Sequence, residues 1–186
     1  MSTRRATRPF TVEEYYRMAE VGILGEDDRV ELLDGEIVQM SPIGSRHSAC
    51  VDRLTRKLTK IPEERAIVRV QNPIRLSERS EPQPDLCLLR PRQDYYSSAH
   101  PGPGDTFLVV EVAETSFEFD RDLKIPVYAR AGVPEVWLVD LDGRRVHAFR
   151  QPSGDGYRSV RRTDPGDELV PQAFPEVRIP VDEILP

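Results

Sequence analysis

Two acidic residues and one lysine stand where the sequence predicts buried structure. Glu111 lies in the middle of the apolar run Thr106–Ala113, and Asp85 follows Pro84 at the start of a second apolar run. A lone carboxylate inside a buried strand is costly unless it has a partner. Lys124 falls on the apolar face of the helix that is expected after Glu111, so it needs a partner as well. We therefore expect the three side chains to form one site.

Two carboxylates and a lysine on neighbouring elements suit a divalent-metal site for phosphodiester hydrolysis. That reaction needs an attacking water, stabilisation of charge on the phosphate and help for the leaving oxygen, all of which a divalent ion can supply. Mg²⁺ favours oxygen ligands and keeps several of its waters. We expect Asp85, Glu111 and the carbonyl of Val112 to hold Mg²⁺ or Mn²⁺. Lys124 would orient the water or stabilise the phosphate charge, since the two acids should favour its ammonium form.

The elements that must position these residues follow a strand–helix–strand order. The buried strand Thr106–Ala113 leads through a connector into a helix that is expected over Arg121–Ala131. Asp120 is its predicted cap, and Pro126 predicts a kink near its middle. The strand Glu135–Asp140 should then run parallel to the first strand, because a crossover helix joins them.

A helix and a hairpin are predicted in the first forty residues. The helix is expected over Phe10–Glu20. Arg29–Met40 is the clearest hairpin signal in the chain, with Asp34-Gly35 as its two-residue turn. Glu31 and Glu36 would lie on the same face of this hairpin, although Glu36 also fits a solvated edge.

A basic helix is predicted from about Ser45 to Ile61. Its apolar residues recur every three or four positions on one face, and that face also carries His47. The remaining surface holds five cationic residues, Arg46, Arg53, Arg56, Lys57 and Lys60, against a single acid. Such a surface is either simply solvated or contacts phosphates, for which Arg and Lys are suited. Taken alone, His47 fits a hydrogen-bonded histidine of the core or of the helix end.

Shorter strands and loops fill the rest of the chain. Alternating residues predict a half-exposed strand over Ala66–Gln71, which Ile74–Leu76 would resume. Residues 91–105 predict a long loop with one short helical turn near Tyr95. An alternating strand is expected over Arg144–Arg150, and the Gly- and Pro-rich remainder should add one or two edge strands.

The composition is typical of a folded protein of the cytoplasm. The chain has 186 residues, of which 38% are hydrophobic and 31% charged, so one domain over residues 1–186 is expected, with 1–9 as a flexible basic arm. No run approaches the roughly 20 apolar residues of a membrane helix, and no secretory signal is recognisable. Cys50 and Cys87 lack metal-ligand spacing, which indicates reduced thiols. The net charge of −6 argues against non-specific coating of nucleic acid but leaves room for a local basic surface.

Four long segments resemble the Uma-two family of restriction-endonuclease-like proteins, a branch of the PD-(D/E)xK nuclease superfamily. They are FTVEEYYRM, GEDDRVELLDGEIVQMSPIGSRH, VQNPIRLSERSEPQPDLCLLRPRQDYY and LVVEVAETSFEFDRDLKIPVYARAGVPEVWLVDLDGRRVHAFR. The resemblance runs almost end to end. It implies an α/β (α+β) fold with a restriction-endonuclease-like central mixed β-sheet flanked by helices, and a metal-dependent nuclease-type site. Within it, Asp85 matches the first acid of the family and Glu111 the second.

The lysine departs from the superfamily pattern. The E-x-K arrangement would place a basic residue two positions after Glu111, where this chain has Ala113. The resemblance implies a branch in which the lysine lies on the following helix, a position that Lys124 fits. Glu31 and His47 match positions typical of the family and are implied as supporting residues of the site.

The sequence therefore predicts a Mg²⁺- or Mn²⁺-dependent endonuclease that hydrolyses nucleic acid, with DNA as the expected substrate. A homodimer would suit cleavage of two strands, and no membrane partner is expected. Two alternatives stay open, namely a catalytically silent binding module that keeps the nuclease fold and a self-associating protein without a nucleic-acid partner. The sequence holds no phosphate-binding loop, nucleophile elbow or HExxH zinc motif.

Overall fold

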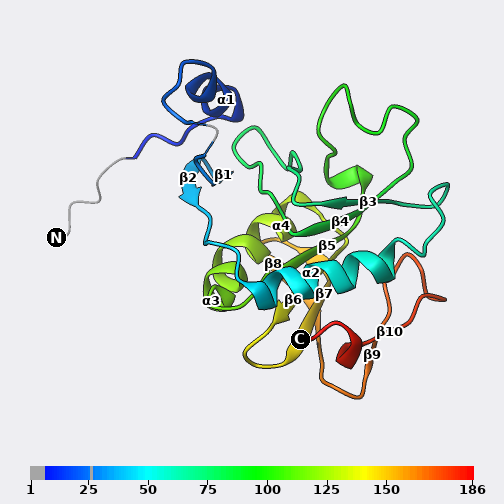
Figure 1. Cartoon of the computed structure of the whole chain (residues 1–186). Helices are drawn as coiled ribbons and strands as arrows, with labels where there is room; N and C mark the ends of the chain where they lie inside the picture. Colours follow the sequence, from blue (N-terminus) through cyan, green and yellow to red (C-terminus); the bar gives the residue numbers. More distant parts are fainter. Residues whose placement is uncertain (1–6, 26) are drawn as a thin grey trace.

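A six-stranded mixed sheet forms the centre of the computed structural model, which describes residues 7–25 and 27–186 (Figure 1). The strand order is β3-β4-β5-β6-β7-β8. The strands are β3 Ile67–Val70, β4 Leu86–Leu89, β5 Thr106–Ala113, β6 Glu135–Asp140, β7 Arg145–Ser153 and β8 Gly156–Thr163. β5 and β6 are parallel, and the other neighbours are antiparallel. The expected α/β fold with a central mixed sheet is confirmed.

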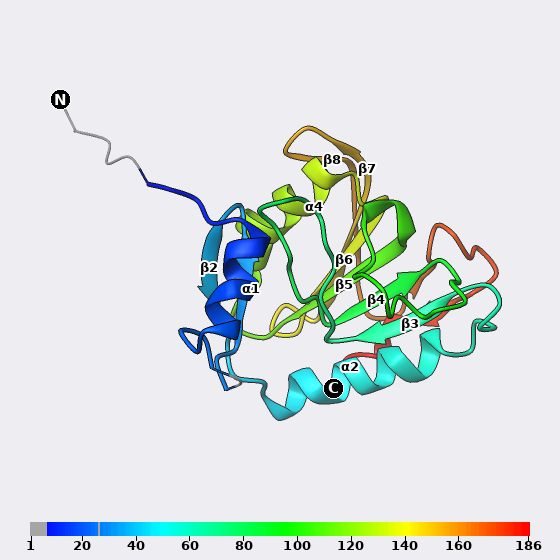
Figure 2. The ribbon, with the colours of Figure 1, turned by 90° about the horizontal axis from the view of Figure 1, so that it is seen from above.

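Helices cover both faces of this sheet (Figure 2). The α-helices of the described residues are α1 Val12–Glu20, α2 Ser45–Leu58, α3 Phe117–Phe119 and α4 Ile125–Ala131. α2 and the C-terminal segment pack on one face, and α4 packs on the other. α1 lies beside the small hairpin of β1 Val30–Leu33 and β2 Glu36–Gln39. Within the described residues, no helix combines the length and the apolar character that crossing a membrane requires.

The two covered faces explain the continuous apolar runs of β4 and β5. Successive side chains of a strand point to opposite faces, so a strand buried on both sides is apolar at every position. The side chains that pack with α2 stand at even positions, namely Leu86, Leu88, Leu108, Val110 and Val112. Those that pack with α4 stand at odd positions, namely Cys87, Leu89, Val109 and Ala113. Glu111 is odd and therefore faces α4.

The N-terminal helix and hairpin form as their sequences predict. Thr11 and Glu14 close a capping box at the start of α1. Asp34 and Gly35 both have positive φ, 49° and 83°, which is typical of a two-residue hairpin turn. A Cβ at position 35 would also lie 2.4 Å from the Cβ of Pro9, so both the turn and the packing require glycine.

The strand register puts Glu31 and Glu36 on one face of the hairpin, as expected. Glu31 pairs with Val38 and Leu33 pairs with Glu36. Glu36 is exposed, whereas Glu31 is only 3% exposed. The same face therefore turns one acid to solvent and the other into the protein.

The expected helix over Arg121–Ala131 is wrong in its first half. The helical segment begins at Phe117 with α3 and continues through a π-helical turn, Asp120–Lys124, into α4. Asp120 is buried within the segment and does not cap it. Pro126 has no N–H group and its ring crowds the preceding turn of an α-helix, so a wider turn accommodates it. Gly132 ends α4 with φ of 81°.

Two smaller expectations are also wrong. Ile74–Leu76 does not resume β3, because its backbone bonds to the loop carbonyls of Pro82 and Ser80. Tyr95 and Tyr96 adopt left-handed φ values of 51° and 61°, which exclude a right-handed helical turn there.

The remaining elements differ only in detail from those expected. α2 ends at Leu58, although Ile61 is still buried in the core. The C-terminal part adds β8 at the sheet edge and a two-stranded ribbon of β9 Glu168–Leu169 and β10 Ile179–Pro180. Most of the expected flexible arm, 1–9, lies outside the described residues.

Candidate active site

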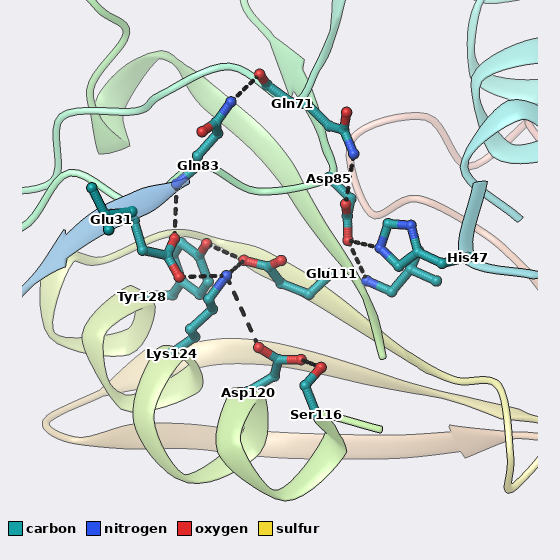
Figure 3. A network of polar contacts seen from close by, with 12 residues as sticks. Glu31, His47, Gln71, Gln83, Asp85, Glu111, Ser116, Asp120, Lys124 and Tyr128 are labelled. Carbon is teal, nitrogen blue, oxygen red and sulfur yellow. Dashed lines mark hydrogen bonds and ion pairs between the residues drawn. The ribbon is translucent and has the colours of Figure 1, made fainter. Parts of the chain in front are cut away.

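A cleft of about 340 Å³ opens where β4 begins, β5 ends and α2 starts. It collects polar side chains from segments that lie far apart in the sequence (Figure 3). All five of the residues predicted for catalysis or its support line it, namely Glu31, His47, Asp85, Glu111 and Lys124, together with Val112. The structure therefore brings together the side chains that the sequence singled out for chemistry.

The pairing of β4 with β5 brings Asp85 next to Glu111. Leu86 stands opposite Val110, so the residue before β4 is level with Glu111. Asp85 Oδ2 accepts the backbone N–H of Val112 at 2.8 Å. This bond fixes the first acid to the strand that carries the second.

Lys124 points towards Glu111, as the mechanism requires. Its Nζ lies 3.2 Å from Glu111 Oε1 and 3.0 Å from Glu31 Oε1. A third carboxylate, Asp120, lies 3.9 Å away. Figure 3 shows the ammonium group at the centre of these three acids. Lys124 is therefore the cation of a buried ionic cluster, which we define as Glu31, Glu111, Asp120 and Lys124.

Tyr128 is a member of the site that the sequence analysis did not identify. Its hydroxyl donates to Glu111 Oε1 at 2.5 Å. Within the described residues no hydrogen bond ends on Glu111 Oε2, which Figure 3 shows turned towards the side of Asp85. The helical spacing of Lys124 and Tyr128 was the available signal, because a buried tyrosine hydroxyl usually needs a partner.

Amide side chains connect Glu31 with Asp85. The backbone N–H of Gln83 donates to Glu31 Oε2 at 3.0 Å. Its side chain donates to the carbonyl of Gln71, whose own amide donates to Asp85 Oδ1 at 3.4 Å. Figure 3 shows this series of hydrogen bonds running from Glu31 through Gln83 and Gln71 to Asp85. Alternation placed Gln71 at the end of a predicted strand, but no pattern in the sequence pointed to either glutamine as part of this site.

The ionic cluster contains three carboxyl groups and one ammonium group. Burial and the neighbouring acids raise the pKa of Glu111 well above its ordinary value, although Lys124 opposes this. Burial also raises the pKa of Asp120, again against Lys124. For Lys124, burial acts to lower the pKa, but Glu111, Glu31 and Asp120 together raise it. Three buried carboxylates around one ammonium group make a site that favours an additional cation.

His47 lies against Asp85 at the start of α2. Its Nε2 is 3.0 Å from Asp85 Oδ2, and its Nδ1 is buried without a hydrogen-bond partner among the described residues. Burial lowers the pKa of His47, but the hydrogen bond and the charge of Asp85 outweigh this and raise it. The histidine is thus hydrogen-bonded at a helix end and is also a neighbour of the first acid.

The basic face of α2 is partly occupied by contacts within the protein. Arg46 lies 2.8 Å from Asp142 and 3.2 Å from Glu114. Arg53 donates to the carbonyl of Leu185, and Lys57 pairs with Glu183. Arg56 is exposed, and so is Lys60, which follows the end of α2. Phosphate binding by this face stays a prediction, and these last two residues are its most accessible cations.

The donor atoms of the cleft suit Mg²⁺ or Mn²⁺. Among residues 7–25 and 27–186 there is no group of three or more His, Cys, Asp or Glu side chains arranged to hold a metal ion. Mg²⁺, however, is commonly held by one or two carboxylates and keeps several waters. Asp85 and Glu111 offer such a pair in a cleft with excess negative charge, so the residues fit the predicted ion.

Comparison with known proteins places this geometry in context. No curated protein matches the chain. A crystal structure of "a putative nuclease belonging to DUF820" from Anabaena variabilis ATCC 29413 has a similar fold, with a TM-score of 0.71 and 16% sequence identity over 95% of this chain and 97% of that one. The family model Uma2, described as "Putative restriction endonuclease", matches residues 12–182. This match confirms the resemblance noted in the sequence, and the chain therefore belongs to the Uma2 family.

Proposed function

We propose that this protein is an endonuclease that hydrolyses phosphodiester bonds in nucleic acid, with DNA as its substrate. The family description and the nuclease fold of the similar structure support a nuclease in general. The observation that carries the proposal is the bond from the Val112 N–H to Asp85, because it sets Asp85 beside Glu111 in an open cleft.

In this proposal Asp85 and Glu111, with the carbonyl of Val112, hold Mg²⁺ or Mn²⁺. When bound, such an ion supplies an activated water and neutralises charge on the phosphate. The protein's part is to fix the two carboxylates. Val112 and His47 hold Asp85 through Oδ2, while Lys124 and Tyr128 hold Glu111 through Oε1.

Lys124 acts as a cation rather than as a base. Its neighbouring carboxylates raise its pKa, so it stays protonated at neutral pH. A protonated lysine cannot accept a proton from water, but it can stabilise negative charge on a phosphate. Both roles expected from the sequence, orienting the water and stabilising the phosphate charge, suit an ammonium group.

The test is cleavage of plasmid DNA by isosteric variants of the two acids. With Mn²⁺ or Mg²⁺, Asp85→Asn and Glu111→Gln should each lower the rate about a hundredfold, which corresponds to ~2.7 kcal/mol of transition-state stabilisation. Asp122→Asn is the matched control, since this carboxylate lies in the same helical segment as Lys124 but is exposed and pairs with Arg121. Unchanged cleavage by purified, folded Asp85→Asn or Glu111→Gln would disprove the assignment.

A catalytically silent binding module is the second candidate. Lys124 and Tyr128 both contact Glu111 Oε1, and this favours the silent module because an oxygen that already has two partners is less available to a metal ion. Calorimetric titration with Mn²⁺ separates the two, because a nuclease must bind the ion and a silent module need not. Sedimentation of the protein with and without DNA tests the proposed homodimer and the alternative of simple self-association.

A further inference from the structure

We propose that the cleft receives one unpaired nucleotide whose base lies against Phe119, so that the preferred substrate is single-stranded nucleic acid rather than regular duplex. This preference rests on the proposed nuclease function and extends it to the class of substrate. Three features of the described residues support it. They are the burial of the two acids, two exposed apolar side chains that line the cleft, and the small number of cations near it that are free to bind phosphate.

The acids are accessible only from inside the cleft. Glu111 is 3% exposed, and the side chain of Asp85 is 13% exposed. The volume of about 340 Å³ is at the lower end of the ~300–1,000 Å³ typical of small-ligand pockets. A phosphate must therefore enter the cleft to reach both acids. A single strand can bend locally to do so, whereas a duplex is stiff over about 150 base pairs.

Two exposed apolar side chains line the cleft. Phe119 is 41% exposed at the end of α3, and Ile43 is 39% exposed just before α2, and both line the cleft. Exposed apolar side chains beside a polar cleft are typical of binding surfaces. An aromatic ring next to a phosphate-binding site stacks with any base, because every base has a π-face. A paired base inside a duplex offers no such face.

The cations near the cleft are too few to follow a duplex backbone. Arg46, Arg53 and Lys57 already contact groups of the protein itself. Arg56 stands nine residues after His47 on α2, about 13 Å along the helix axis. Arg29 lines the cleft and is exposed, and although its guanidinium donates to the carbonyl of Ser41, its other N–H groups can contact one phosphate near the site. With a net charge of −6, the protein suits a substrate that needs only a few phosphate contacts.

The first experiment compares a labelled single strand with the blunt duplex of the same sequence, with Mn²⁺ present. We expect the single strand to be cleaved about tenfold faster or more, given the usual strength of base–aromatic stacking. Phe119→Ala should raise KM for the single strand by about tenfold and leave kcat nearly unchanged, whereas Phe119→Trp should retain the wild-type KM. Tyr95→Ala is the control, since Tyr95 is 58% exposed and does not line the cleft.

The second experiment uses a single strand with one abasic position. Cleavage beside that position should be the same for the wild type and for Phe119→Ala, because the ring has no base to stack on. Equal cleavage of single strand and duplex, or no effect of Phe119→Ala on an intact strand, would overturn the inference while the nuclease assignment stands.

A third measurement keeps the inference testable if no nucleic acid is cleaved and the proposed function fails. Fluorescence anisotropy then compares binding of the same single strand and duplex to the wild type and to Phe119→Ala. Tighter binding of the single strand that depends on Phe119 supports the substrate class. Equal binding, absence of binding or independence from Phe119 contradicts it.

Discussion

The balance of charge around Lys124 predicts unequal costs of two substitutions. Lys124→Met removes the ammonium group that lies among three buried carboxylates and should lower the free energy of unfolding by about 3–5 kcal/mol. Glu111→Gln removes one of the surplus acids and should cost less than ~1 kcal/mol without metal. Urea unfolding in the presence of a chelator measures both. Equal losses would show that the cluster is not dominated by excess negative charge.

Glu111 shows how far the site could be predicted from the sequence. An acid within a buried strand predicted a partner, and Asp85, Lys124, Glu31 and His47 do meet it in one cleft. Its direct contacts, however, are Lys124 and Tyr128, while Asp85 contacts the backbone of the next residue. Gln83 donates to Glu31 from a remote segment, and such a contact leaves no periodic pattern from which it could be predicted.

Tyr128 should act on metal binding through the orientation of Glu111. Tyr128→Phe keeps the ring in its buried position and removes the hydroxyl that holds Oε1. We expect Mn²⁺ affinity to fall about 10–100-fold, as for other residues that orient a metal ligand. Calorimetry checks this, with Tyr157→Phe as the control because its hydroxyl donates to the carbonyl of Val133. The same affinity in both variants would assign Tyr128 a purely structural role.

At the scale of elements, the hairpin, α2, β5 and β6 were predictable, whereas the segment before α4 was not. Apolar spacing and turn residues identified the former, because burial on defined faces leaves a periodic pattern. Pro126 did indicate an irregular helix. Whether the result is a kink or a π-helical turn depends on where the side chains of this turn find partners. Lys124 pairs with acids on β1 and β5, whereas Asp120 accepts a hydrogen bond from Ser116 and pairs with Lys124 itself.

The contacts of α2 predict a weak dependence of nucleic-acid binding on salt. With three of its cations engaged within the protein, mainly Arg56 and Lys60 remain to bind phosphates. Each phosphate contact to a single strand contributes about −0.7 to the slope of log K against log salt. We expect a slope of about −1.4 to −2 from binding in increasing KCl, including the contact of Arg29. A slope of about −4.2, as for six contacts, would mean that Arg46, Arg53 and Lys57 leave their contacts within the protein on binding.

At the scale of the whole molecule, the raised pKa of Glu111 makes stability depend on pH. Between its ordinary value of 4.5 and its raised value, the folded protein binds more protons than the unfolded chain. The contribution of this group is therefore fully favourable below the ordinary value and is lost as pH rises through the raised one. Without metal, the stability of the wild type should fall relative to that of Glu111→Gln across this range. Urea unfolding at several pH values measures the free energy of unfolding of both proteins. The same dependence on pH for the wild type and for Glu111→Gln would contradict this prediction.

The hydrogen bond from the Val112 N–H to Asp85 makes the NMR signal of this amide sensitive to the state of Asp85. A backbone amide proton that donates to a carboxylate resonates at a position that depends on the charge of that carboxylate. The Val112 amide signal should therefore move when a cation or a proton reaches Asp85, whereas amides in the middle of β6 should not. Occupancy of the first acid can then be followed by NMR in the unmodified protein, without any substitution or any substrate.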